Sequence, residues 1–484
     1  MRSPNFSVHR ASKAKASPRK SRLGSAEVAD FKTVLLRTCR HEDVMVIPTL
    51  QKLQGEWDRQ APEPYSQEVE HEEIFGGCAP PVPPVIQVIY EEQAPIQVIC
   101  KGFYVEYALI HALFAALSSF PTITALKIED CCISNEVVCT LAVLIPESPI
   151  VDLSLDGNVD IARDLPMLFN IGLHHLSLRR CSLTDEVMQK ICKELEYNPR
   201  KTQKLLSLNL NMNCIGDEGC LALARALRSN RTLVSLSLCG NWITDEGACY
   251  LADVISKFRL THEEIMLRRR RNFDRLLSRK TILDKALETW RTKSEIEKLK
   301  MVDRIAGKRA RSMEAGQKGT LSSREKRRGM SYSEKSRSKR KSEARERATL
   351  IPEPSPTEMK DILHWVDSEV ELDDHPFVAE VELDNCEYYC RGCWRLGNLN
   401  LAYNRITEHT VGRFLEAVCY QDQAFSNPRR GLLRLVIQPG NAIPRDSCPV
   451  AELNCVLQAR CRKETTSEQV LDVSQQPEKR PPKK

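Results

Sequence analysis

The chain has 484 residues, of which 28% are charged, and a formal net charge of +6. Its length allows two or three domains, and its longest nearly apolar run, 108–120, is too short to span a bilayer. The N-terminus lacks the apolar core of a secretory signal. Nineteen cysteines without such a signal predict free thiols in a reducing, cytoplasmic compartment.

The positive charge is confined to two stretches. Residues 1–26 hold seven Lys and Arg and no acidic residue, and 261–350 hold 28 Lys and Arg against 13 Asp and Glu. The remaining residues are therefore acidic on balance. The sequence predicts two cationic segments attached to an acidic body.

The N-terminal part precedes any repeat. Residues 1–30 are polar, basic and serine-rich, which predicts a disordered tail. We expect 31–122 to form an N-terminal cap, with short strands at 85–90 and 96–99 and a helix at 104–119. Such a cap would cover the apolar surface that the first unit of a repeat array leaves open.

A leucine pattern at 205–233 recurs 28 residues later. Leu, Leu, Leu, Asn and Ile occupy relative positions 1, 4, 6, 9 and 11, and an apolar stripe at helical spacing follows. The two copies are Leu205, Leu208, Leu210, Asn213 and Ile215, then Leu233, Leu236, Leu238, Asn241 and Ile243. A unit of this length predicts one strand followed by one helix. Because strand side chains alternate, the leucines at positions 4 and 6 face the core.

These residues resemble the ribonuclease-inhibitor type of leucine-rich repeat, whose pattern is LxxLxLxxNxIxxxGxxxLAxAL. The resemblance implies an α/β leucine-rich-repeat solenoid, a horseshoe with a concave parallel sheet and convex helices. It also implies that protein binding is the usual activity.

Five repeats fill 123–256, beginning at 123, 150, 173, 205 and 233. The second is short and has Asp160 where an apolar residue belongs. The pattern stops after Ser256 and resumes at Leu396 and Leu432, giving repeats six and seven and a C-terminal cap in 391–462. Because two repeats are too few to fold alone, we expect one continuous solenoid from which 257–390 loops out. Lengthening that connection from 10 to 140 residues costs only about 2 kcal/mol.

The insertion and the C-terminal tail have their own composition. Residues 257–320 predict a basic amphipathic helical insertion, ended by Gly307 and later glycines. Residues 321–390 predict a disordered linker, first basic and then acidic, with one docking turn formed by Ile362, Leu363, Trp365 and Val366. Residues 463–484 predict a disordered tail.

Partner binding is predicted on the concave face, at strand positions that point away from the core. These positions are Lys127, Glu129, Asp152, Asp156, His175, Arg179, Asn209, Asn211, Ser235, Ser237, Asn398 and Asn400. Their side chains are polar, as those of a solvated sheet face without a partner would also be.

Polyanion binding is predicted at two basic clusters of the insertion, Arg268, Arg269, Arg270 and Arg271, and Lys339, Arg340 and Lys341. Clustered cations gain affinity for acidic polymers by counterion release. The long basic interruption of the repeats resembles leucine-rich-repeat proteins of motile cilia and flagella. That resemblance implies an axonemal location with tubulin as the acidic partner. The second cluster has the composition of a nuclear import signal, so a nuclear location is the second prediction. Nucleic acid is less favoured, because few aromatic residues accompany the basic ones.

No catalytic motif is present: both GxxxxGK[ST] and HExxH are missing. Cys386, Cys390 and Cys393 lie near His375, but a second pair of ligands at suitable spacing is lacking, so we expect no zinc site and no cofactor. The sequence predicts a non-enzymatic scaffold or adaptor. A regulator of a small GTPase and a nucleic-acid-binding protein remain as alternatives.

Overall fold

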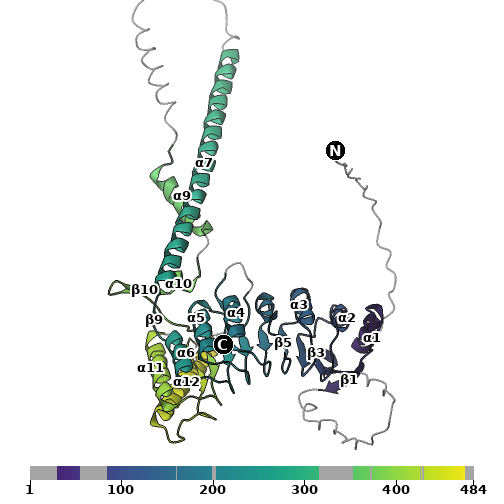
Figure 1. The fold of residues 1–484 in the computed structure, drawn as a ribbon. Coiled ribbons are helices and arrows are strands. Elements are labelled where there is room, and N and C mark those ends of the chain that lie inside the picture. The colour runs from purple at the N-terminus through teal and green to yellow at the C-terminus, as the bar shows by residue number, and fades with distance from the viewer. Residues whose placement is uncertain are drawn as a thin grey trace, which may run out of the picture.

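The computed structural model describes residues 30–54, 84–159, 161–198, 203–315, 353–370, 373–425, 427 and 430–474. Side chains are described for all of these except 306–315 and 463–474. The repeats form a curved array with a sheet on one side and helices on the other, and one long helix projects from the array (Figure 1).

A ten-stranded sheet runs through the whole array. Its strands, in spatial order, are β1 (Thr49–Gln54), β2 (Val85–Glu91), β3 (Ala94–Lys101), β4 (Ala125–Glu129), β5 (Asp152–Ser154), β6 (His175–Ser177), β7 (Ser207–Asn209), β8 (Ser235–Ser237), β12 (Asn398–Asn400) and β13 (Arg434–Val436). All neighbouring strands are parallel except β2 and β3, which are antiparallel. The predicted leucine-rich-repeat solenoid is confirmed.

Helices follow most strands of the array. They are α1 (Phe31–His41), α2 (Tyr107–Leu117), α3 (Asn135–Leu144), α4 (Asp185–Leu195), α5 (Asp217–Ser229), α6 (Asp245–Ile255), α11 (Glu408–Ala424) and α12 (Cys448–Ser474). After α3, a short 3-10 turn, η2 (Ile145–Glu147), leads to the second repeat. That repeat has the 3-10 turn η3 (Leu165–Asn170) in place of an α-helix. In this repeat, the apolar position expected at Asp160 is filled by the next residue, Ile161, which is fully buried.

The prediction of a disordered tail at 463–484 was wrong as far as Ser474, because α12 continues to that residue. Residues 475–484 lie outside the described residues.

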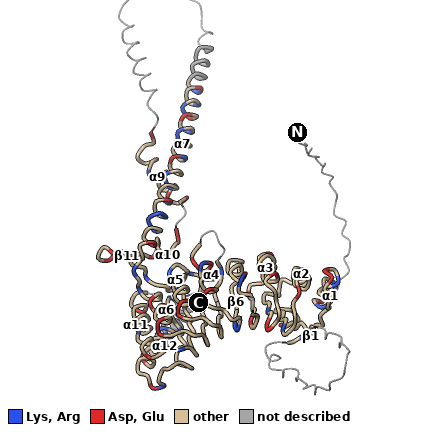
Figure 2. Tube along the Cα trace, viewed as in Figure 1, with Lys and Arg blue, Asp and Glu red and all other residues tan. Residues whose placement is uncertain are grey.

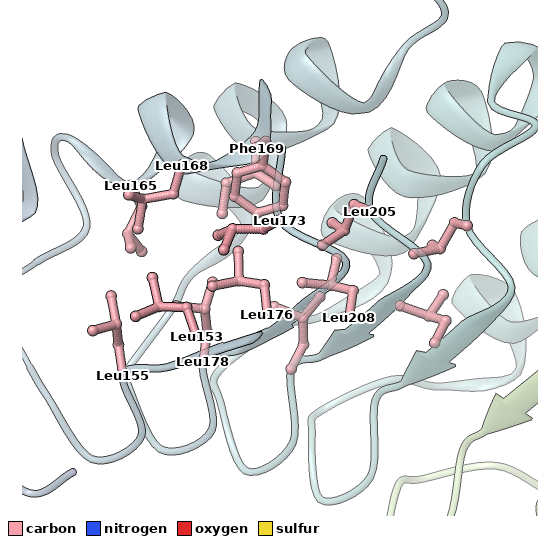
Figure 3. Close-up of a cluster of buried hydrophobic side chains, with 14 of the residues drawn as sticks. Leu153, Leu155, Leu165, Leu168, Phe169, Leu173, Leu176, Leu178, Leu205 and Leu208 are labelled. Atoms are coloured by element: carbon pink, nitrogen blue, oxygen red, sulfur yellow. The ribbon is translucent and has the colours of Figure 1, made fainter. Parts of the chain in front are cut away.

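The core is a stack of leucines, one layer per repeat (Figure 3). Leu208, Leu236 and Leu399 occupy the same position on β7, β8 and β12, and each is 1% exposed. Parallel pairing at identical register places these side chains directly over one another. Each repeat therefore buries its apolar face against its neighbours.

The ladder interrupted after Ile255 resumes in the same sheet. Strand β12 pairs with β8, with Asn398 opposite Ser235 and Asn400 opposite Ser237. The N–H group of Thr407 donates to Asp245 of the fifth repeat at 2.8 Å. The predicted continuity of the solenoid across the insertion is confirmed.

An asparagine ladder holds successive turns together. The amide oxygen of Asn404 accepts hydrogen bonds from the N–H groups of Asn241 (3.1 Å) and Ile243 (3.3 Å). Its amide nitrogen donates to the carbonyls of Leu238 and Leu401, each at 3.0 Å. The side chain thus satisfies buried backbone groups in two repeats that are about 160 residues apart in the chain.

Replacing Asn404 with alanine should lower the free energy of unfolding by about 1–3 kcal/mol, because buried N–H and C=O groups lose their partners. Urea denaturation of the full chain measures the loss. The matched control is Asn398→Ala, a change at an exposed strand position, which should leave stability within about 0.5 kcal/mol. Equal losses for the two variants would contradict a structural role for the Asn404 amide.

The N-terminal strands extend the repeat sheet. Strand β3 pairs in parallel with β4 from Gln97 opposite Ala125 to Lys101 opposite Glu129. Helix α1 covers the outer side of α2, and the ring of Phe31 meets that of Phe120 edge to face at 5.2 Å. Both strands and the helix predicted in 85–119 are present, the helix as Tyr107–Leu117.

The insertion forms an arm and a small sheet. The arm consists of α7 (His262–Ala315), alongside which lies α9 (Pro356–Glu369); the short α10 (Pro376–Ala379) is at its base. The sheet contains β9 (Phe258–Arg259), β10 (Val381–Asp384) and β11 (Glu387–Cys390), all antiparallel. None of the described helices combines the length and apolar composition needed to cross a membrane.

Two predictions for the insertion were wrong, at least in part. Helix α7 does not end at Gly307 but continues to Ala315, directly before Gly316, one of the later glycines expected to end it. Part of 321–390, predicted to be a disordered linker, is folded, because Ser355 and Glu358 form a capping box that starts α9 and residues 376–390 pack at the base of the arm. The basic part, 321–352, lies outside the described residues.

Candidate functional site

The concave face brings the twelve predicted partner-binding residues together on six neighbouring strands. Nine lie within β4, β5, β6, β7, β8 and β12, whereas Asp156, Arg179 and Asn211 lie in the loops after their strands. All twelve are exposed or half-buried, and the leucines between them are buried. Their location on one face agrees with the alternation of strand side chains, and their role in binding stays a prediction.

Polar side chains on this face bond from one repeat to the next. The hydroxyl of Ser177 donates to Asp156 at 2.6 Å and accepts from the amide of Asn209 at 3.0 Å. The hydroxyl of Ser237 donates to the amide oxygen of Asn211 at 2.7 Å. These contacts hold the side chains in defined rotamers, so a ligand would meet a preorganised surface.

Charge is unevenly distributed along the concave positions. Among the twelve predicted positions, carboxylates occur only in the first and second repeats, as Glu129 on β4 and as Asp152 and Asp156 on β5 and the loop after it. From β7 to β12 the predicted positions are Ser and Asn. Lys127 lies 4.0 Å from Glu129, and the exposed Arg179 follows in the third repeat. The concave face therefore has an end with charges of both signs, where carboxylates outnumber cations, and a long neutral part.

A hollow of about 320 Å³ opens on the neutral part. It spans β8, β12 and β13, so strands from both sides of the insertion form it; the polar residues lining it are Ser235, Ser237, Asn398, Asn400 and Arg434. Arg434, at the exposed start of β13, was missed in the sequence. The repeat pattern itself was a sufficient signal, because Arg434 has the same relative position in the seventh repeat as Asn398 in the sixth.

Large exposed apolar and aromatic residues on the loops after the strands were also missed. Met212, Trp242 and Tyr403 are 49%, 55% and 63% exposed, and the guanidinium of Arg405 lies 5.9 Å from the centre of the Trp242 ring. Met, Trp, Tyr and Arg are enriched in protein interfaces. They lie on the loops after β7, β8 and β12, on either side of the point where the ladder resumes.

The first predicted polyanion-binding cluster is largely used within the chain. Arg268 donates to the carbonyls of Phe377 (2.9 Å) and Val378 (3.0 Å), and Arg271 pairs with Asp373 at 3.1 Å. These contacts hold α7 to the base of the arm, and polyanion binding at the cluster stays a prediction. Arg269 and Arg270 are exposed, and Lys339, Arg340 and Lys341 lie outside the described residues.

Two further ion pairs connect the arm to the convex helices. Arg228 of α5 pairs with Glu264 at 2.5 Å, and its guanidinium lies 3.9 Å from the centre of the Phe258 ring. Arg231 pairs with Glu380 at 2.8 Å, and these two side chains are only 11% and 20% exposed. Pairs that are this well buried and multiply hydrogen-bonded are costly to break. They orient α7 relative to the solenoid.

His375, Cys390 and Cys393, which the sequence places near one another, are buried at the base of the arm. Burial and the nearby Arg271 charge lower the pKa of His375 to about 4, so its neutral Nδ1 accepts from the N–H of Phe377 at 3.0 Å. Burial raises the pKa of the Cys390 and Cys393 thiols. Among the described residues, no three His, Cys, Asp or Glu side chains are grouped to hold a metal ion.

Comparison with known proteins identifies the repeats. A family model described as Leucine Rich repeat matches residues 201–224 and 229–252, which include β7 with most of α5 and β8 with most of α6. No curated protein gives a significant match to the chain. The fold and these two matched units define a protein with leucine-rich repeats arranged as a solenoid, a class that typically serves protein–protein interaction.

Proposed function

We propose that the chain is a non-enzymatic scaffold of the ribonuclease-inhibitor type that binds a protein partner on its concave face. The observation that carries this proposal is the hollow shared by β8, β12 and β13. It lies on a preorganised polar surface, and the loops that follow β8 and β12 carry the exposed Trp242 and Tyr403. A surface of this kind fits a protein segment that places aromatic or aliphatic anchors at these loops and hydrogen-bonding groups in the hollow.

Charge supports one orientation of that segment. Glu129, Asp152 and Asp156 favour a basic part of the partner over β4 and β5, and Arg434 favours an acidic part over β13. Opposite charge at the two ends would fix the direction of binding and raise the association rate more than the affinity.

A photo-crosslinking amino acid at Ser237 and, separately, at Asn400 tests the proposal in intact cells. These residues face each other on β8 and β12, so both positions should capture the same partner. Position Val143 on convex helix α3, 68% exposed, is the control and should not capture it. Filling the hollow with Asn398→Trp should reduce crosslinking from Ser237 at least about tenfold, which corresponds to 1.4 kcal/mol of binding energy. Equal capture from Val143, or no effect of Asn398→Trp, would reject the concave face as the binding surface.

We also propose, from the resemblance to ciliary repeat proteins, a cytoplasmic or axonemal location in which the basic insertion contacts tubulin or another acidic surface. Arg269 and Arg270 support this proposal, since they remain exposed on α7. Nucleic acid is the less favoured acidic partner of the basic insertion, and a nuclear location goes with it; this alternative rests on the same attraction between clustered cations and a polyanion.

A further inference from the structure

Helix α7 is much longer than the segment that covers it. Its 54 residues correspond to about 80 Å at 1.5 Å per residue. Helix α9 covers only the middle: Asp367 pairs with Arg279 at 2.7 Å, and Glu358 near the start of α9 accepts from Trp290 at 3.4 Å. Beyond Trp290, α7 continues past the first residue of α9 (Figure 1).

The apolar stripe under α9 continues along this uncovered part. Leu283 and Leu287 are half-buried where α9 lies on α7. Met301 and Ile305 follow them by 18 residues, which is five complete helical turns, so they lie on the same face. Met301 is 66% exposed and Ile305 is 55% exposed. The apolar face on which α9 packs therefore continues toward the C-terminal end of α7, where no described residue covers it.

Helix α9 shows what this face accepts. Its apolar residues have i, i+3, i+4 and i+7 spacing: Met359, Ile362, Leu363 and Val366, the last of which is fully buried. The helix has four acidic residues against one lysine. It is an acidic amphipathic helix packed on a basic one.

The outer part of α7 has the complementary charge. Residues 291–315 contain eight Lys and Arg and four Asp and Glu. Both signs occur along the part of α7 whose side chains are described, which ends at residue 305 (Figure 2). A second copy of α7 would bring two basic helices together. The chain's own segment 316–352 contains 12 Lys and Arg against four Asp and Glu, so its charge also does not fit.

We propose that the outer face of α7, around Met301 and Ile305, binds an acidic amphipathic helix of another protein, placed end to end with α9. This inference is independent of the concave face. It makes the arm a helix-docking surface in which apolar contacts give the binding energy and carboxylates select the partner.

The probe is a fluorescein-labelled synthetic peptide with the sequence of residues 353–370, which contains α9 with its capping box. Anisotropy titration with the full chain should give saturable binding. The double variant Met301→Glu/Ile305→Glu should weaken it at least about tenfold. The control Thr292→Glu adds one negative charge, half that of the double variant, on the opposite face nine residues before Met301, and should leave binding unchanged. A peptide with its five acidic residues changed to lysine should bind at least about tenfold more weakly than the acidic peptide.

Three results would overturn the proposal. The first is no binding of the acidic peptide to the full chain, and the second is equal binding by the double variant and the wild-type chain. The third is a wild-type dimer, seen by light scattering, that the double variant converts to monomer, because the face would then be occupied by a second copy. Because Met301 and Ile305 are exposed, replacing them with glutamate should not unfold the protein. Circular dichroism of each variant checks that a loss of binding is not caused by a loss of folding.

Discussion

Replacing Arg231 with alanine should lower the free energy of unfolding by about 3–5 kcal/mol, the range for removing one partner of a buried ion pair. The change leaves the carboxylate of Glu380 in a poorly hydrated site, where the indole N–H of Trp394, at 2.9 Å, is its remaining partner. It also removes the hydrogen bonds that Arg231 donates to the carbonyls of Leu227 and Asn230. Urea denaturation measures the loss, and hydrogen exchange in β10 and β11 should speed up because the ion pair attaches β10 to the solenoid.

The control for this prediction is Arg279→Ala. Arg279 pairs with Asp367 at 2.7 Å, but the two side chains are 38% and 56% exposed. An exposed pair contributes about 0–1 kcal/mol. If the two variants lost the same stability, the base of the arm would be held by something other than the buried Arg231–Glu380 pair.

Replacing Gly392 with alanine should destabilise the point at which the chain re-enters the solenoid. Gly392 has φ +90°, and a Cβ atom there would lie 2.4 Å from the carbonyl oxygen of Ser256 and 2.6 Å from that of Ile255. Backbone strain alone costs about 1–3 kcal/mol, and the overlap with two backbone carbonyls adds to it. The N–H group of the next residue, Cys393, donates to the carbonyl of Val254 at 2.8 Å. The clash therefore cannot be relieved without breaking the hydrogen bond that joins the returning chain to the fifth repeat. Thermal unfolding and the exchange rate of the Cys393 amide measure the effect.

Gly412→Ala is the matched control for Gly392→Ala. Gly412 lies inside α11, and a Cβ atom there would meet nothing within 4 Å. Alanine is preferred to glycine in a helix interior by about 1 kcal/mol, so this variant should be as stable as the wild type or more stable. A stable Gly392→Ala variant would mean that the chain leaves and re-enters the solenoid differently from this structure.

The repeat architecture follows from the spacing of apolar residues. Leucines at relative positions 4 and 6 point to the same face on a strand, and the stripe that follows forms one face only on a helix. The same positions recur from Leu233 to Leu396, which is why the continuity of β8 and β12 could be predicted through a gap of about 140 residues. The concave positions were predictable for the same reason, since strand side chains alternate.

The base of the arm was not predictable in this way. Arg268 and Arg271 have the composition of a polyanion site, yet they contact Phe377, Val378 and Asp373, about 100 residues later. No periodicity connects these residues. Residues 376–390 are rich in acidic and polar groups, and this composition led to the prediction of disorder. They are folded because Arg231 pairs with Glu380 and Arg268 of α7 donates to the carbonyls of Phe377 and Val378.

The sequence by itself determined the solenoid, its interruption and its resumption, because each depends on local spacing repeated along the chain. The tertiary structure alone decided which charges are available to a partner and which are used within the chain. It also decided that α9 covers only part of α7. Ion pairs and helix docking join residues far apart in the sequence, and their free energy depends on burial that only the assembled fold produces.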